Sequence, residues 1–435
     1  MEAYAKAVLY IIPVFLLLMA IEMIYGIVVK KNTFRSFDTI TGISSGITNS
    51  VKDLLGLTLV VIAYSWLYEK LALIEIESTI LVYVICFVCI DFSSYWVHRL
   101  RHHVNYFWNE HVVHHSSEEF NMACALRQSI SSFFGIYSVL LIPAALLGVP
   151  PKVIAIVSPI HLFLQFWYHT RHIPKLGFLE YIIVTPSQHR VHHAINPIYL
   201  DKNLSAIFCI WDRAFGTFQE ELDEEPCVYG VKKAPQTWNP IWINFQHLWL
   251  LIKDAWRTNN WFDKLRIWFM PLGWRPEDIK DKFPIDYIDD PKDQVKYDTQ
   301  ASAALHIWSW VQLAMTHLFL VLMLINFTEI GFPNLFVYGA FLFIHIYAYS
   351  ALMDLKKSAV IVETLKCFGG IFWILQSGDW FGINDYWAIG SFVVIGYLVA
   401  SMFITLGFVV KEFSTSNQMV NVSTKKTTRI SSSGF

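Results

Sequence analysis

Nine apolar runs alternate with polar stretches along this chain. They cover residues 4–28, 54–73, 79–97, 130–147, 153–168, 305–327, 335–352, 359–375 and 387–410. Runs of about 20 apolar residues with few charges predict helices that cross a membrane. The fifth run is shorter, so it could form with the fourth a shallow hairpin that does not fully cross. We therefore expect an all-α, polytopic integral membrane protein with about nine apolar runs and seven to nine spans.

Basic residues mark alternate loops between these runs. They are Lys30, Lys31, Arg35, Arg99, Arg101, Arg171, Lys175, Lys356, Lys357 and Lys411. Because cytoplasmic loops are enriched in Lys and Arg, this pattern predicts an external N-terminus and a cytoplasmic C-terminus. The first run has no small-residue cleavage site after it, so we interpret it as a retained span.

The balance of apolar and polar residues divides the chain further. Residues 1–78 and 301–412 would hold the N-terminal and C-terminal spans, and 79–220 a polar site at the cytoplasmic face. In residues 221–300, the spacing of Phe245, Leu248, Trp249 and Ile252 predicts an amphipathic helix. That helix either packs in a core or lies at the membrane surface. The Ser/Thr-rich residues 413–435 favour a disordered cytoplasmic tail.

Overall composition agrees with a membrane protein and excludes other classes. Only 16% of residues are charged, against about 25% in an average soluble domain. The formal net charge of −2 gives no sign of nucleic-acid binding. The six cysteines are too few and too scattered for a disulfide framework.

Histidines are concentrated in one region, which holds twelve of the sixteen between residues 98 and 193. Two HxxHH triplets and one i, i+4 pair contain most of them: His111, His114, His115, His189, His192, His193, His98 and His102. On a helix these spacings place the imidazoles on one face. Imidazole is the commonest metal ligand, whereas converging neutral histidines without a metal would leave unsatisfied polar atoms costing about 1–3 kcal/mol each.

More imidazoles converge than one ion can hold, so we infer two metal ions. Imidazole suits iron, copper, zinc and nickel alike, but no cysteine lies near the clusters, which disfavours structural zinc and favours a redox-active pair. Further candidates at the edge of the pattern are His103, His161, His169 and His172. Asp91 lies inside an apolar run, and we expect it to hydrogen-bond His98 or His102.

The motifs HRLRH (98–102), HVVHH (111–115) and HRVHH (189–193), in this order, resemble the fatty acid hydroxylase/sterol desaturase superfamily of integral-membrane di-iron enzymes. WDRAFGTF (211–218) is similar to the segment that ends its domain. Within that superfamily, the runs at 107–129 and 185–203 and the segment VETLKC (362–367) are similar to the alkylglycerol monooxygenase family. The resemblance therefore implies that residues 79–220 form a fatty acid hydroxylase-type di-iron domain.

The resemblance also implies a reaction and a set of ligands. O2 would hydroxylate the ether-linked carbon of a 1-O-alkylglycerol or lyso ether lipid, which then yields a fatty aldehyde and a glycerol derivative. Two iron ions would be held by His98, His102, His111, His114, His115, His169, His189, His192 and His193. The implied membrane is the endoplasmic reticulum of a eukaryote or the inner membrane of a bacterium.

The implied reductant is tetrahydrobiopterin, but one position departs from the family. His103 directly follows the second histidine of the first motif, where these enzymes usually have Glu. His103 could join the metal set, or another electron donor could serve.

Two other functions remain open at this point. One is a sterol, carotenoid or fatty-acyl hydroxylase or desaturase of the same superfamily. The other is a metal transporter or sensor without catalysis, which the strongly apolar spans disfavour.

Overall fold

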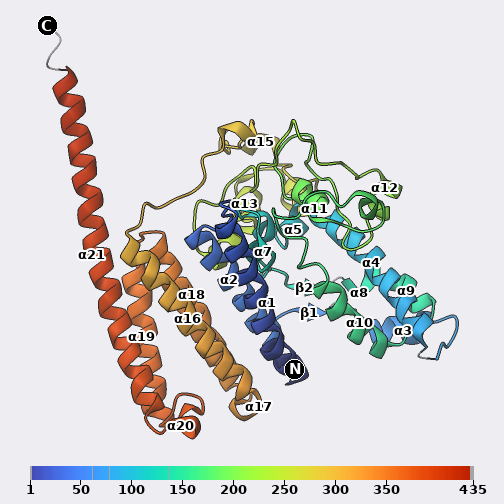
Figure 1. Cartoon of the computed structure of the whole chain (residues 1–435), viewed down its shortest axis with the longest axis horizontal. Helices are drawn as coiled ribbons and strands as arrows, with labels where there is room; N and C mark the ends of the chain where they lie inside the picture. The colour runs from blue at the N-terminus through green and yellow to red at the C-terminus, as the bar shows by residue number, and fades with distance from the viewer. Residues whose placement is uncertain (1, 61, 78, 136, 432–435) are drawn as a thin grey trace. The chain divides into compact units, whose positions relative to one another are not determined.

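The computed structural model describes residues 2–60, 62–77, 79–135 and 137–431, with side chains up to residue 412. These residues are mostly helical (Figure 1). Their only strands are β1 (Leu59–Val60) and β2 (Phe134–Gly135), which pair in parallel. The chain forms two compact units, one of residues 12–236 and 241–296, and one of residues 1–11, 237–240 and 297–435. The all-α prediction is confirmed.

Six helices in the described part of the chain are long and apolar enough to cross a membrane. They are α1 (Glu2–Val28), α4 (Ile80–His103), α16 (Ala303–Ile325), α18 (Asn334–Met353), α19 (Ser358–Ser377) and the apolar part of α21 (Gly390–Ser431). The expected seven to nine spans were therefore too many. We expected residues 413–435 to be a disordered tail, whereas α21 continues to Ser431 and residues 432–435 lie outside the described part.

Three of the nine apolar runs do not become spans. Residues 54–73 divide into β1 and α3 (Tyr64–Leu71), after Gly56 turns the chain with a positive φ of 64°. Residues 130–147 divide into β2, α8 (Tyr137–Leu140) and α9 (Ile142–Leu146), where Pro143 opens a new helix and cannot continue the previous one. The 13-residue α10 (Pro151–Phe163) is about 20 Å long, short of the roughly 30 Å hydrocarbon layer.

These short helices nevertheless have a structural role beside α4. Val82 and Cys86 of α4 are fully buried in an apolar cluster with Leu141, Val153 and Val157. The apolar runs therefore supply packing for the helix that carries the first histidines.

The remaining helices connect and cover these elements. In the larger unit they are α2 (Ser36–Leu54), α5 (Asn105–Trp108), α6 (Val112–His115), α7 (Met122–Ala125), η1 (Gly177–Tyr181), α11 (Pro186–His192), α12 (Ile210–Phe215), α13 (Pro240–Arg257), α14 (Trp261–Arg266), α15 (Glu277–Lys280) and η2 (Pro291–Asp293). In the C-terminal unit they are α17 (Phe327–Ile330) and α20 (Ile383–Tyr386). The amphipathic helix expected around residues 245–252 is α13.

The segment after α13 is hydrogen-bonded to the C-terminal end of α4 and the residues that follow it. The backbone N–H of Asn105 donates to Met270 at 3.0 Å, that of Tyr106 to Trp268 at 2.9 Å, and that of Leu272 to the His103 carbonyl at 2.9 Å. The Asn105 side chain also donates to the Ile267 carbonyl at 3.0 Å. Hydrogen bonds from residues 267–272 thus fix the path of the chain where it leaves α4.

The C-terminal unit encloses a polar network that hydropathy did not reveal. Lys366 of α19 is fully buried and lies 2.6 Å from Glu363, 3.1 Å from His345 Nδ1 of α18 and 3.4 Å from Ser401 of α21. Gln312 of α16 donates to Ser401 at 2.7 Å. Four membrane helices are therefore held in register by hydrogen bonds as well as by apolar packing.

Candidate metal centre

Four local structures present the predicted ligands. His98 and His102 lie one turn apart near the end of α4, and His111 to His115 occupy α6 and the residue before it. His169 follows α10 after a turn. The last triplet lies on α11, whose start is set by Pro186 in the first turn and by the Thr185 hydroxyl, which accepts from the Gln188 N–H.

The structure brings all nine predicted ligands together, and it divides them into two groups. The first group is His98, His102, His111, His115 and His192, and the second is His114, His169, His189 and His193. Within each group, the ring nitrogens that could bind an ion all lie within 4.8 Å of one another. The local spacing of the histidines does not predict this division, because each HxxHH triplet contributes to both groups.

Because each triplet contributes histidines to both groups, the two groups lie side by side. The rings of His115 and His193 stack with centroids 4.4 Å apart, although they belong to different groups. The His114 and His193 rings, within the second group, are 4.6 Å apart. Two ions held here would be neighbours in one centre.

Hydrogen bonds at the outer edge of the rings determine which nitrogen faces inward. Nδ1 donates to a backbone carbonyl in His98 (Leu204, 2.8 Å), His169 (Gln165, 3.0 Å) and His192 (Lys202, 2.9 Å). A carbonyl can only accept, so Nδ1 carries the proton and a neutral ring keeps a free lone pair on Nε2. In metal sites the same outer bond fixes the tautomer and the ring orientation.

His102 is held in a similar way by a side chain. Its Nδ1 lies 3.2 Å from the Asp201 carboxylate, and its Nε2 is buried with no hydrogen-bond partner in the described part of the chain, as is Nε2 of His192. Elsewhere the Nε2 atoms face one another, at 2.8 Å between His98 and His111 and at 2.9 Å between His169 and His189. Rings protonated on Nδ1 carry no proton on Nε2, so these inward Nε2 atoms cannot all hydrogen-bond one another. Metal ions would satisfy their lone pairs.

Burial keeps these rings neutral and ready to bind. It lowers the pKa of His114 to about 4. Burial and then the neighbouring imidazoles hold the pKa values of His111, His115, His189 and His193 well below the ordinary value. A neutral imidazole is the form that binds a metal.

Aromatic residues wall the two groups. The Trp108 ring packs 5.2 Å from the His102 ring and 5.5 Å from that of His115. On the second group, Phe120 lies 5.2 Å from His193, and Tyr168 lies 4.3 Å from His189. These rings give both groups apolar neighbours, while His98, His111 and His114 are only partly buried.

The loop that supplies the outer carbonyls is organised by Asp212. Its carboxylate accepts from the Leu204 N–H at 2.7 Å, the Ser205 N–H at 3.0 Å and the Thr217 hydroxyl at 2.7 Å. This gives WDRAFGTF a physical role, since its aspartate holds the loop against His98. Sequence reasoning missed Asp201 and the carbonyls of Lys202 and Leu204, which carry no motif of their own.

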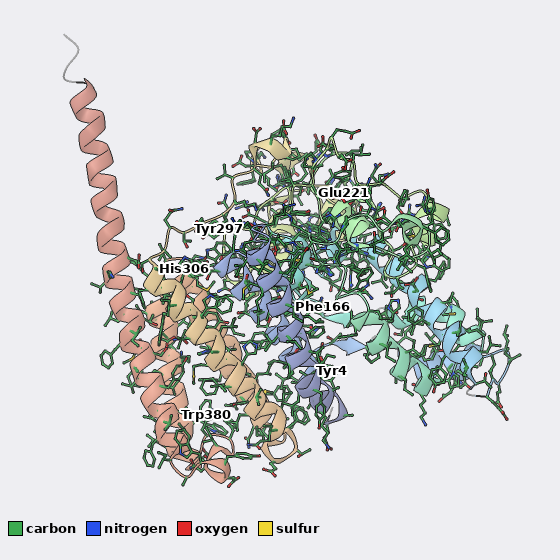
Figure 2. All side chains as sticks on the ribbon, viewed as in Figure 1. Tyr4, Phe166, Glu221, Tyr297, His306 and Trp380 are labelled. Atoms are coloured by element: carbon green, nitrogen blue, oxygen red, sulfur yellow. The ribbon has the colours of Figure 1, made fainter. Side chains whose placement is uncertain are left out.

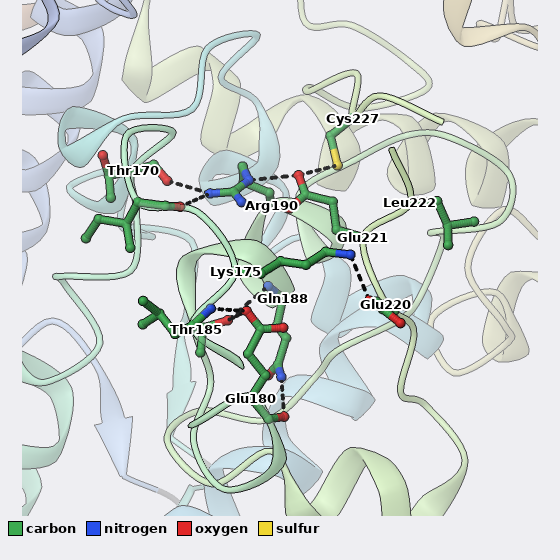
Figure 3. A network of polar contacts seen from close by, with 12 residues as sticks. Thr170, Lys175, Glu180, Thr185, Gln188, Arg190, Glu220, Glu221, Leu222 and Cys227 are labelled. Carbon is green, nitrogen blue, oxygen red and sulfur yellow. Dashed lines mark hydrogen bonds and ion pairs between the residues drawn. The ribbon is translucent and has the colours of Figure 1, made fainter. Parts of the chain in front are cut away.

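Arg190, between the histidines of the last triplet, holds the chain that follows His169. It donates to the Thr170 and Ile173 carbonyls at 3.2 and 2.9 Å and pairs with Glu221 at 2.7 Å (Figure 3). The residues after His169 are therefore fixed relative to α11.

The other candidates lie outside both groups. His103 is exposed, and its Nδ1 donates to the Arg99 carbonyl at 2.8 Å. His172 is half-buried against α1. His161 is buried 2.9 Å from Asp91.

Asp91 has partners other than those we expected. Besides His161, its carboxylate accepts from the backbone N–H groups of Ile207 and Phe208 at 2.9 and 3.1 Å and from Trp211 Nε1 at 2.8 Å. The predicted bond to His98 or His102 is not found among the described residues. Asp91 instead ties α4 to the loop that carries the outer carbonyls.

Comparison with known proteins places the centre in a family domain. Residues 83–217 match the model of the fatty acid hydroxylase family. The chain is 32% identical over 357 residues to the alkylglycerol monooxygenase of Homo sapiens, covering 82% of this chain and 79% of that protein. It is 30% identical over 380 residues to the alkylglycerol monooxygenase of Xenopus tropicalis, covering 86% and 82%. Over 136 residues it is 31% identical to the ornithine lipid hydroxylase OlsE of Rhizobium tropici, covering 31% and 41%. No solved structure matches the chain significantly.

Proposed function

The chain belongs to the alkylglycerol monooxygenase family, and on that basis we propose that it hydroxylates the ether-linked carbon of 1-O-alkylglycerol lipids. It is a membrane oxidoreductase with a fatty acid hydroxylase domain. One oxygen atom of O2 enters the C–H bond, and the other leaves as water with two electrons and two protons. The hemiacetal then separates into a fatty aldehyde and a glycerol derivative.

The observation that carries this proposal is the convergence of nine imidazoles in two adjacent groups. We propose that one iron ion is held by His98, His102, His111, His115 and His192, and the other by His114, His169, His189 and His193. The pair would supply the activation of O2 that insertion into an unactivated C–H bond requires. The residues of the chain hold the ligands through fixed outer hydrogen bonds and pack the aromatic rings of Trp108, Phe120 and Tyr168 against them.

We propose that the two electrons come from an external donor, with tetrahydrobiopterin as the candidate that the family implies. The exposed position of His103, outside both groups, supports leaving it out of the metal set. We also propose that the metal centre faces the cytoplasm, since α4 ends in Arg99, Arg101 and the first ligands. The membrane would be the endoplasmic reticulum of a eukaryote or the inner membrane of a bacterium.

The decisive experiment combines metal content with an aldehyde assay. Purified protein with hexadecylglycerol and O2 should release hexadecanal and contain two irons per chain. The assay is run with and without tetrahydrobiopterin. An absence of aldehyde under every reductant tried would refute the proposal.

His102→Ala and His103→Ala form a matched pair for the ligand assignment. Both remove an imidazole from the last turn of α4, but only His102 belongs to a group. We expect His102→Ala to lose iron and activity and His103→Ala to keep its iron. Equal iron loss in both variants would contradict the assignment.

A further inference from the structure

Glu22 is a carboxylate inside the first membrane-spanning helix that the proposed chemistry does not use. Its side chain is 5% exposed. One oxygen, Oε2, accepts from the Met122 N–H at 2.7 Å and so ties α1 to α7. The other oxygen, Oε1, is buried and accepts no hydrogen bond of good geometry from the described residues, although the Thr170 hydroxyl lies close to the carboxyl. A lone ionisable residue in a span points to function, because an unsatisfied carboxylate is costly there.

A second unpartnered polar atom lies on the same face of α1. The half-buried His172 packs over Gly26, where an added Cβ would come within 3.1 Å of its Nε2. This Nε2 is buried and has no partner among the described residues. Glu22 and Gly26 are four residues apart, about one helical turn, so Glu22 and the ring that packs over Gly26 lie on the same stripe of α1.

The position of this polar pair relative to the metal centre is fixed by the chain itself. His172 follows the predicted ligand His169 by three residues, and the Thr170 hydroxyl lies beside the Glu22 carboxyl. Arg190 anchors the Thr170 and Ile173 carbonyls on either side of His172, as Figure 3 shows for Thr170. The pair is therefore a built feature next to the second histidine group.

The chain just before His169 is apolar. Two turns before Glu22 on α1, the Phe15 ring contacts those of Phe166 and Phe163, with centroids 4.6 and 5.7 Å apart. Phe166 is labelled beside α1 in Figure 2. Along the chain the order is thus apolar rings, then the ligand His169, then the polar pair.

This order matches the order of groups in an alkylglycerol, which has an alkyl chain, an ether carbon and two free hydroxyls. We propose that Glu22 Oε1 and His172 Nε2 hydrogen-bond the two hydroxyls of the glycerol end and so position the ether carbon at the metal centre. A hydroxyl both donates and accepts, so it satisfies a carboxylate oxygen and either form of a neutral imidazole nitrogen. This inference rests on the proposed function and names the residues that would select its substrate.

The test compares two ethers that release the same aldehyde. Hexadecylglycerol has both hydroxyls, whereas hexadecyl methyl ether has none. In Glu22→Ala and His172→Ala, we expect KM and Kd for hexadecylglycerol to rise about 10- to 100-fold, with kcat within a few-fold of wild type. For the methyl ether, both variants should match the wild type.

Two further variants separate recognition from folding. Gly26→Ala keeps both polar groups but displaces the His172 ring, so it should show the same selective rise in KM. Glu220→Gln changes an exposed carboxylate that pairs with Lys175 and belongs to neither histidine group, so it should behave as wild type. Iron content and melting temperature are measured for each variant, because a structural role of Glu22 through Met122 would lower both.

The outcomes also separate this inference from the proposed function. Wild type that forms no aldehyde from either ether would overturn the proposed function, and the Kd comparison would still test the polar pair. Active wild type with unchanged Kd in the variants would overturn the inference alone. An equal loss with both ethers would overturn it as well, because a binding residue for hydroxyls must distinguish them.

Discussion

Asp201→Gly should weaken one iron site and leave the other intact. Among the described residues, Asp201 is the only side chain that holds an outer ring nitrogen of the first group, since His98 and His192 use backbone carbonyls that substitution cannot remove. Its backbone has a positive φ of 56°, which glycine adopts without strain. Glycine therefore removes the acceptor of the His102 Nδ1–H and little else.

The size of the effect follows from the geometry of this contact. Loss of a partner that orients a ligating histidine typically costs 10- to 100-fold in metal affinity. The Asp201 side chain is 48% exposed and the contact is 3.2 Å long, so water can replace it in part. We expect the lower limit, about tenfold, which corresponds to about 1.4 kcal/mol.

Competition with an iron chelator measures this directly. Wild type and variant are titrated with chelator, and the iron that remains per chain is counted. We expect one of the two irons in Asp201→Gly to leave at about tenfold lower chelator concentration, with the second unchanged. Asp201→Asn keeps an acceptor oxygen and should fall between the two. Equal weakening of both irons, or no change, would refute the division into two groups with Asp201 serving one.

Three further predictions concern ligands, pH and the C-terminal unit. His111→Ala and His189→Ala should each abolish aldehyde formation and lower iron content, as metal analysis will show; full iron in either would contradict its role. Because burial lowers the pKa of His114 from 6.5 to about 4, metal-free protein should keep its stability above pH 6.5 and lose it as the pH falls through about 4, which melting curves measure. A melting temperature independent of pH in that window would oppose this. Lys366→Met leaves the Glu363 carboxylate buried without its cation and should destabilise the protein by about 3–5 kcal/mol, whereas exposed Lys357→Met should not; similar unfolding curves for both would count against a role for the network.

The sequence predicted eight of the nine histidines because their spacing is local, whereas His169 was included through its position after an apolar run and through the family resemblance. Residues at i, i+3 and i+4 share a helix face whatever surrounds them, so two HxxHH triplets and an i, i+4 pair suffice to identify a metal centre. The division of each triplet between two groups depends on how α4, α6 and α11 meet. That arrangement is set by loops such as the one held by Asp212, and no residue spacing records it.

The number of spans was overestimated because hydropathy measures composition and not continuity. Gly56 and Pro143 break runs that are apolar enough to cross, and α10 ends before it is long enough. Polar residues inside true spans were undervalued for the same reason. Lys366 and Glu22 each change the window-averaged hydropathy very little. A single ionisable residue inside a span nevertheless indicates a functional or structural role, and both residues could have been singled out on that ground.

The outer carbonyls at Lys202 and Leu204 impose an order on the synthesis of this protein. His98 is made early, but its imidazole is not oriented until the loop near residue 204 has been translated and held by Asp212 and Thr217. More than a hundred residues separate the first ligand from the acceptor that fixes it. Iron that arrives before the ribosome has passed this loop would meet an incomplete set of ligands. Binding of an ion by the first histidine group must therefore follow translation of this loop, and a truncation just after His193 should yield a membrane-inserted chain whose first group cannot retain a metal ion.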